Sequence, residues 1–264
     1  MSSKMVDERL LSCDQIDSAN RKYRPTIRGR CEATVGEGAG ERATELLDQA
    51  VDKMIACRDR LQAAETVVKR ERTESVAATA KRDKAAEACR QKVLPLRNTI
   101  TGLFGESYAR KLGFVGPTPD QPVSIYRLCS EILTNVATVP APTVSIGEMA
   151  VAPAKLVEPL AEPTEALRLA LQEVTDEQRE SDMAQIAKNQ AIAEYDKAFA
   201  VAANLMSTLL EMAGERDLAR RVRPSNRRPG TTVDVAGGEA ESELPADVPA
   251  DPGASAPSAV EVTG

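Results

Sequence analysis

A long run without glycine, from Glu41 to Thr101, most constrains what this chain can fold into. The run contains one proline, Pro95, and is rich in residues that favour helices. Its apolar residues recur at helical spacing: Leu47, Val51, Met54, Leu61, Val68, Ala86, Cys89, Val93, Leu96, Ile100 and Leu103. We therefore predict a long amphipathic helix from Glu41 to Phe104. It is expected to kink near Pro95, because the proline ring displaces the carbonyl four residues back.

A second long helix is predicted to begin near Pro163 and to end at Met212. Its second half carries apolar residues three and four positions apart, which is heptad spacing. These seam residues are Ile192, Tyr195, Phe199, Ala202, Met206, Leu209 and Ala213. After Gly214 a short basic helix is expected to end at Pro224, so that residues 163–224 form one segment.

Shorter elements separate the two long helices. Glycine at position 105 should end the first one, and a short helix capped by Gly113 completes the segment 41–116. In the segment 117–162, residues 122–137 have the pattern of a helix that starts at Pro122, but their β-branched and aromatic residues also fit a strand. The four prolines between Thr138 and Glu162 then predict an irregular, proline-rich connector.

The two ends of the chain lack long regular patterns. In residues 1–40 a short helix around Val6–Lys22 is compatible with the spacing, but Pro25 and four glycines predict a flexible N-terminal arm. Residues 225–264 are rich in Pro, Gly, Ala, Glu and Ser, which predicts a disordered tail. Seven acidic and no basic residues follow Thr231, so most of the net charge of −6 belongs to this tail. A globally basic nucleic-acid binder is therefore not indicated.

The two long helices resemble each other. The seam from Ala86 to Leu103 matches the seam from Ile192 to Leu209 at a constant offset of 106 residues. Each seam is followed by Gly-Glu, then Ala-Arg with another basic residue, and then Pro. Alanine-rich helices also align by chance at heptad spacing, so an internal duplication and a chance match both stay open. A duplication would pack two similar halves about a pseudo-twofold axis.

Together these patterns predict an all-α fold. We expect an elongated bundle of two long antiparallel amphipathic helices with short helices added. Three Phe, four Tyr and no Trp are too few for a thick core, which favours narrow seams between helices.

The chain contains no histidine, which excludes histidine-based nucleophilic catalysis and histidine-ligated metals. No other catalytic constellation is recognisable, so we expect a non-catalytic protein without a cofactor. Five widely spaced cysteines without a Cys-x-x-Cys motif predict reduced thiols in a cytoplasmic protein. The most apolar stretch, Ala198–Gly214, is interrupted by polar residues and is predicted to be a buried helix face; conditional membrane insertion is the alternative.

Three groups of residues are candidates for function. The leading hypothesis is a structural or interaction protein that offers its seam to a protein partner or a second copy, through Ile192, Tyr195, Phe199, Met206 and Leu209. The second group is a cluster of arginines at the end of the short basic helix: Arg220, Arg221, Arg223, Arg227 and Arg228. We expect these cations to stabilise the C-terminus of that helix or to bind the acidic tail. Binding to nucleic acid or anionic lipid is the less favoured alternative. A carboxylate face is predicted to be solvated, with a metal-binding bundle as the alternative: Glu173, Glu177 and Glu180.

Overall fold

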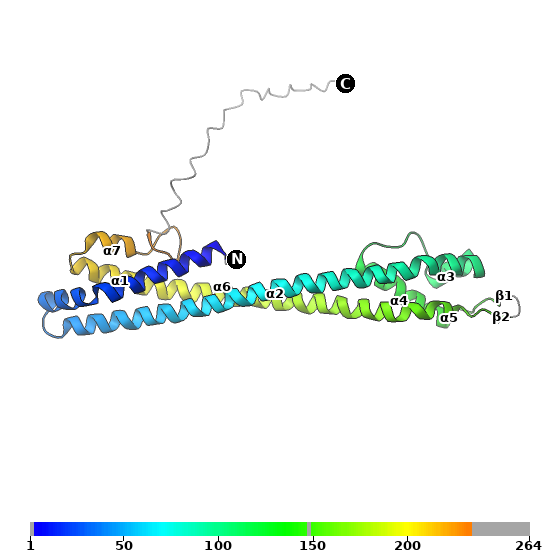
Figure 1. Ribbon diagram of the computed structural model, residues 1–264, viewed down its shortest axis with the longest axis horizontal. Coiled ribbons are helices and arrows are strands. Elements are labelled where there is room, and N and C mark those ends of the chain that lie inside the picture. Colours follow the sequence, from blue (N-terminus) through cyan, green and yellow to red (C-terminus); the bar gives the residue numbers. More distant parts are fainter. Residues whose placement is uncertain (1–2, 147–148, 234–264) are drawn as a thin grey trace, which may run out of the picture. The chain divides into compact units, whose positions relative to one another are not determined.

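The computed structural model describes residues 3–146 and 149–233 and shows an all-α protein, as predicted (Figure 1). The helices are α1 (Lys4–Val35), α2 (Ala39–Phe104), α3 (Glu106–Leu112), α4 (Pro122–Thr138), α5 (Pro153–Val157), the 3-10 turn η1 (Glu158–Leu160), α6 (Ala161–Met212) and α7 (Arg216–Val222). Two two-residue strands, β1 (Ser145–Ile146) and β2 (Met149–Ala150), pair antiparallel, with Ser145 opposite Ala150 and Ile146 opposite Met149.

Both long helices are confirmed. Helix α2 continues through Pro95, where the predicted kink stays a prediction, and α6 begins two residues before Pro163. Residues 122–137 form a helix rather than a strand, with Pro122 at its first turn. Its missing N–H costs no hydrogen bond there, which is why proline starts the helix instead of breaking it. Gly113 adopts the predicted left-handed C-cap of α3.

The flexible arm predicted for residues 1–40 is wrong. Residues 4–35 form one helix, α1, which passes through Pro25. Its apolar side chains are buried at helical spacing, and this tertiary burial outweighs the local preference against proline and glycine: Val6, Cys13, Ile16, Ile27 and Cys31. Gly40 is not a flexible point either, because a Cβ there would lie 2.2 Å from the carbonyl oxygen of Arg28. Glycine at this position lets α2 start close against α1.

The disorder predicted from residue 225 is also wrong for residues 225–233. The chain folds back after α7, so that Pro224 forms a β-bridge with Thr232 and the Ser225 N–H donates to the Thr231 carbonyl at 2.8 Å. Thr232 is fully buried, and its backbone N–H donates to Ser12 Oγ at 3.1 Å. The sequence pattern missed this turn because its partner lies 220 residues away, on α1. The rest of the predicted tail, residues 234–264, lies outside the described residues.

The chain divides into two compact units. Unit 1 consists of Ser3–Ile55 and the described residues from Asp196 onward, and unit 2 consists of Ala56–Tyr195. Unit 1 therefore contains α1, the beginning of α2, the end of α6 and α7, which lie side by side in Figure 1. Unit 2 contains the end of α2, α3, α4, α5 and the beginning of α6. Each unit thus combines the beginning of one long helix with the end of the other.

Each unit has its own buried apolar side chains. Those of unit 1 include Ile16, Ile27, Leu47, Met54, Phe199, Met206 and Leu210. Those of unit 2 form one cluster contributed by α2, α3, α4, η1 and α6, including Val93, Ile100, Leu112, Ile125, Cys129, Ile132, Leu160 and Leu167. Few of these residues are aromatic, which agrees with the narrow seams expected from the composition.

The two seams share burial at four of their six matched positions, and the internal duplication stays a prediction. At the offset of 106 residues, buried positions match one another: Cys89 with Tyr195, Val93 with Phe199, Leu96 with Ala202, and Ile100 with Met206. Both long helices end before a glycine with positive φ, and each is followed by a seven-residue helix, α3 or α7. Local structure and burial therefore agree with a duplication, but apolar residues at heptad spacing are buried in any packed helix pair, so both alternatives stay open.

Candidate functional site

The most unusual part of unit 2 is a two-helix stretch, formed by residues 56–85 of α2 and 171–195 of α6. Figure 1 shows the two helices side by side here, away from α3, α4 and α5. Three ion pairs connect them across unit 2: Arg60 with Glu194, Glu65 with Lys188, and Lys81 with Glu173. Residue numbers rise along α2 as they fall along α6, which confirms that the helices run antiparallel in this unit.

The seam of the two-helix stretch is partly charged. Glu65, Glu71 and Lys188 are buried in it beside small side chains such as Ala78 and Ala184. Glu65 Oε2 lies 2.5 Å from Lys188 Nζ, and both side chains are at most one tenth exposed. Buried pairs of this kind add little net stability, but losing one partner is costly because a charge then stays buried. The pair therefore favours one register of α2 against α6.

About two turns further along α2, three carboxylates from both helices meet. Glu71 and Glu74 come from α2 and Glu177 comes from α6, and one carboxylate oxygen of each lies within 4.8 Å of the other two. We call these three residues the carboxylate cluster. Glu71 is 3% exposed, Glu177 is half-buried and Glu74 is exposed. The cluster thus has a buried side within the seam and an open side at Glu74.

The cluster holds more negative charge than its hydrogen bonds neutralise. Arg70 Nη2 donates to Glu71 Oε1 at 2.7 Å, and Arg70 Nε lies 3.8 Å from Glu74 Oε2. The second oxygens of Glu71 and Glu177, both named Oε2, are buried and have no hydrogen-bond partner. Burial raises the pKa of Glu177, and the neighbouring carboxylates raise it further, in the order Glu180, Glu74, Glu71 and Glu173.

The predicted carboxylate face on α6 is reproduced only in part. Of Glu173, Glu177 and Glu180, the structure brings Glu177 alone into the cluster. Glu173 pairs with Lys81 at 2.5 Å, and Glu180 is exposed. The sequence analysis missed Glu71 and Glu74 because they lie on the other helix. The middle of each long helix is polar in sequence, at Lys69–Lys84 and at Glu173–Asn189, which was a signal that polar groups of the two helices could meet. Polar residues alone, however, do not define the register in which two helices pair.

The predicted arginine cluster is divided among different partners in unit 1. Arg223 pairs with Glu211 at 2.9 Å, and Arg228 pairs with Glu8 of α1 at 2.9 Å. Arg220, Arg221 and Arg227 have exposed side chains. Two of the five arginines thus serve contacts within the unit, and ligand binding by the cluster stays a prediction.

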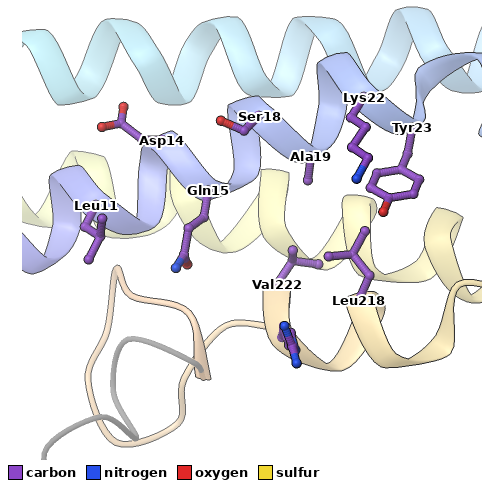
Figure 2. A pocket seen from close by; sticks show the side chains of 10 residues that line it. Leu11, Asp14, Gln15, Ser18, Ala19, Lys22, Tyr23, Leu218 and Val222 are labelled. Atoms are coloured by element: carbon purple, nitrogen blue, oxygen red, sulfur yellow. The ribbon is translucent and has the colours of Figure 1, made fainter.

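An open groove of about 470 Å³ lies in unit 1 between α1 and α7. Figure 2 shows the side chains that line it. Leu218 and Val222 of α7 face Ala19 and Tyr23 of α1 across it. Its charged lining residues are one acid and two bases: Asp14, Lys22 and Arg221. This mixed lining brings together no set of side chains that would define a ligand or a reaction.

The seam predicted as a docking surface is buried within the chain. Tyr195, Phe199 and Met206 are fully buried, Leu209 is 6% exposed and Ile192 is half-buried. The seam is therefore wrong as a free interaction surface. In unit 1 the reason is α1, whose apolar side chains supply burial that the sequence analysis did not expect.

No protein family, curated protein or solved structure matches this chain. None of the described helices is long and apolar enough to cross a membrane.

Proposed function

We propose that this chain is a non-catalytic structural or interaction protein that associates with a second copy through the two-helix stretch. The supporting observation is the outward position of large apolar side chains along that stretch. Val76 is 71% exposed on α2, and Met183 and Ile186 are 70% and 57% exposed on α6. Met183 and Ile186 are three residues apart, so they lie on the same side of α6.

The composition of the stretch supports the same proposal. Two paired helices bury only one side of each. Leu61 and Tyr195 are buried at one end of the stretch, but further along it the buried side chains are mostly charged or small, such as Glu65, Glu71, Ala78 and Ala184. Such a pair gains little stability from burial on its own. A second copy would add two more helices and give a four-helix arrangement, the common solution for helices with apolar faces.

The absence of histidine from the whole sequence supports a non-catalytic role. Several charged groups of the two-helix stretch have partners within the helix pair: Lys81 pairs with Glu173 across the helices, and Arg70 pairs with Glu71 along α2. These contacts account for those charges as structural features of the helix pair.

The test is the molar mass of the full chain in solution, measured by light scattering over a range of concentrations. We expect a dimer that dissociates on dilution. The double variant Met183→Lys/Ile186→Lys should be monomeric with unchanged helix content, since both side chains are exposed. Its melting temperature should equal that of the wild type only at dilutions where the wild type is also monomeric. Val201→Lys, at a 62% exposed position of α6 in unit 1, is the matched control and should still form the dimer.

A monomer at every concentration would overturn self-association. Equal dimerisation of the wild type and the double variant would overturn the proposed surface. A monomer that gains one defined protein partner, whose binding the double variant abolishes, would show that this surface takes a different chain instead of a second copy.

A further inference from the structure

The buried carboxylate of Glu71 is not fully neutralised by the ion pairs of unit 2. The side chain is 97% removed from solvent, and one of its two oxygens, Oε2, has no hydrogen-bond partner. An ionised oxygen that is buried without a donor or a counter-ion costs more free energy than a lost neutral hydrogen bond. Buried charges in proteins are normally paired or bound to a metal ion.

Arg70 provides a partner for only one of the two carboxylate oxygens of Glu71. Its guanidinium donates to Oε1 of Glu71 and not to the unpartnered Oε2, and its Nε lies 3.8 Å from Glu74 Oε2. Lys81, another base of the stretch, pairs with Glu173. Three carboxylates with one guanidinium leave a net negative charge, and Oε2 of Glu177 is a second buried oxygen without a partner. The two unpartnered oxygens come from different helices.

The spacing of the carboxylates fits one bound cation. The three oxygens lie within 4.8 Å of one another. Two oxygens that bind one Ca²⁺ at about 2.3–2.6 Å lie at most about 5 Å apart, and around Mg²⁺ at most about 4 Å. All three ligands are carboxylates, which favour hard divalent ions such as Ca²⁺, Mg²⁺ and Mn²⁺ over metals that prefer nitrogen or sulfur.

We propose that Glu71, Glu74 and Glu177 form a binding site for a hard divalent cation that joins α2 to α6. Glu71 and Glu177 supply the buried oxygens, and the exposed Glu74 closes the site on the side from which the ion enters. Water completes the coordination, as is usual where a site offers few protein ligands. Because the ligands come from two helices, binding stabilises their pairing in unit 2 and thereby the folded chain.

The experiment uses the full chain after treatment with a chelator and its removal. Calorimetric titration with CaCl₂, MgCl₂ and MnCl₂ should show one site per chain for at least one ion, and that ion should raise the melting temperature. Glu71→Gln and Glu177→Gln should each weaken binding by more than about tenfold, because the charge of the ligand set controls affinity. Glu87→Gln, at an exposed position of α2 in unit 2, is the matched control and should bind like the wild type.

Glu74→Gln keeps the test valid if the buried variants fold poorly, since position 74 is exposed and the change leaves the seam intact. It should weaken ion binding without lowering the melting temperature of the ion-free protein. Luminescence of bound Tb³⁺, competed by the favoured ion, gives a second readout.

No heat of binding and no change in melting temperature with any of the three ions would overturn the proposal. Equal binding by the wild type, Glu74→Gln and Glu177→Gln would also overturn it, and would assign the ion to other carboxylates of this acidic chain.

Discussion

Arg9 of α1 and Asp196 of α6 form a two-pronged ion pair within unit 1. Arg9 Nε donates to Asp196 Oδ1 at 2.8 Å and Nη2 donates to Oδ2 at 2.9 Å. The side chains are 7% and 19% exposed, and the parallel geometry suits a guanidinium and a carboxylate. The pair connects α1 to the part of α6 that lies in unit 1. Helix α1 is the element whose full length was not predicted from local sequence patterns.

Breaking this pair should destabilise the chain strongly. Arg9→Gln removes the buried charge that faces the half-buried carboxylate of Asp196, and we expect the free energy of unfolding to fall by about 3 kcal/mol. Arg21→Gln on the same helix is the matched control: Arg21 also pairs with an aspartate, Asp17, but is 75% exposed. It should cost less than about 1 kcal/mol. Urea unfolding followed by circular dichroism measures both, and equal losses would contradict the role assigned to Arg9.

Gly230 lies directly against the Arg9–Asp196 pair. Its φ is +75°, and an added Cβ would lie 2.0 Å from Asp196 Oδ1. Gly230→Ala should therefore destabilise the chain by at least about 1–2 kcal/mol, because a left-handed φ alone costs an alanine that much. The contact with Asp196 adds to the loss.

The same glycine-to-alanine substitution should stabilise the chain at Gly29. It lies inside α1, and a Cβ there would meet nothing within 4 Å. Gly29→Ala should raise the free energy of unfolding by about 0.5–1 kcal/mol, since alanine favours helices. Thermal melting compares the two variants, and a neutral or stabilising Gly230→Ala would show that the turn at 225–233 does not pack on α1 as described.

The Glu65–Lys188 pair should control how α2 pairs with α6 in unit 2. Lys188→Met removes the cation that lies 2.5 Å from the buried Glu65, and we expect a loss of about 3 kcal/mol. The double variant Glu65→Leu/Lys188→Leu should recover most of this loss, because apolar side chains often replace a buried pair without cost. Lys84→Met, at an exposed position of α2, is the control.

A double variant as unstable as Lys188→Met would contradict this account of the Glu65–Lys188 pair. A recovered stability with two or more species in ion-mobility or crosslinking measurements would instead show that the pair selects one helix register. That outcome would agree with the use of buried polar groups for register in other helix pairs.

Local patterns predicted the long helices because they depend on residues a few positions apart. The spacing of Val93, Leu96 and Ile100 indicates a helix wherever the rest of the chain lies. Helix α1 was recognised only as a short helix compatible with residues 6–22, because Pro25 and Gly29 argue against a longer helix locally. Ile16 and Ile27 favour the full helix only through burial against other helices. The carboxylate cluster was missed for the same reason. Glu71 and Glu177 become neighbours only through the register of α2 against α6.

The five cysteines lead to the last prediction. All are buried, and Cys89 and Cys129 of unit 2 lie in the same apolar cluster. The hydrogen bond between their thiols, together with burial, raises the pKa of Cys129 far above its usual range, and burial raises the pKa of Cys31. The same bond lowers the pKa of Cys89, but that thiol is fully buried.

Attack on a disulfide reagent needs an accessible thiolate, so burial and a raised pKa both suppress the reaction. At mildly alkaline pH we expect the thiols of the native chain to react with Ellman's reagent only as fast as local or global unfolding exposes them. In guanidinium chloride all five thiols should react at once. Val115→Cys, at a 72% exposed position outside the two-helix stretch, is the positive control and should add one fast thiol. A fast native thiol in the wild type would show that one of the five lies at a site that opens readily. Partial digestion and mass spectrometry would then identify it.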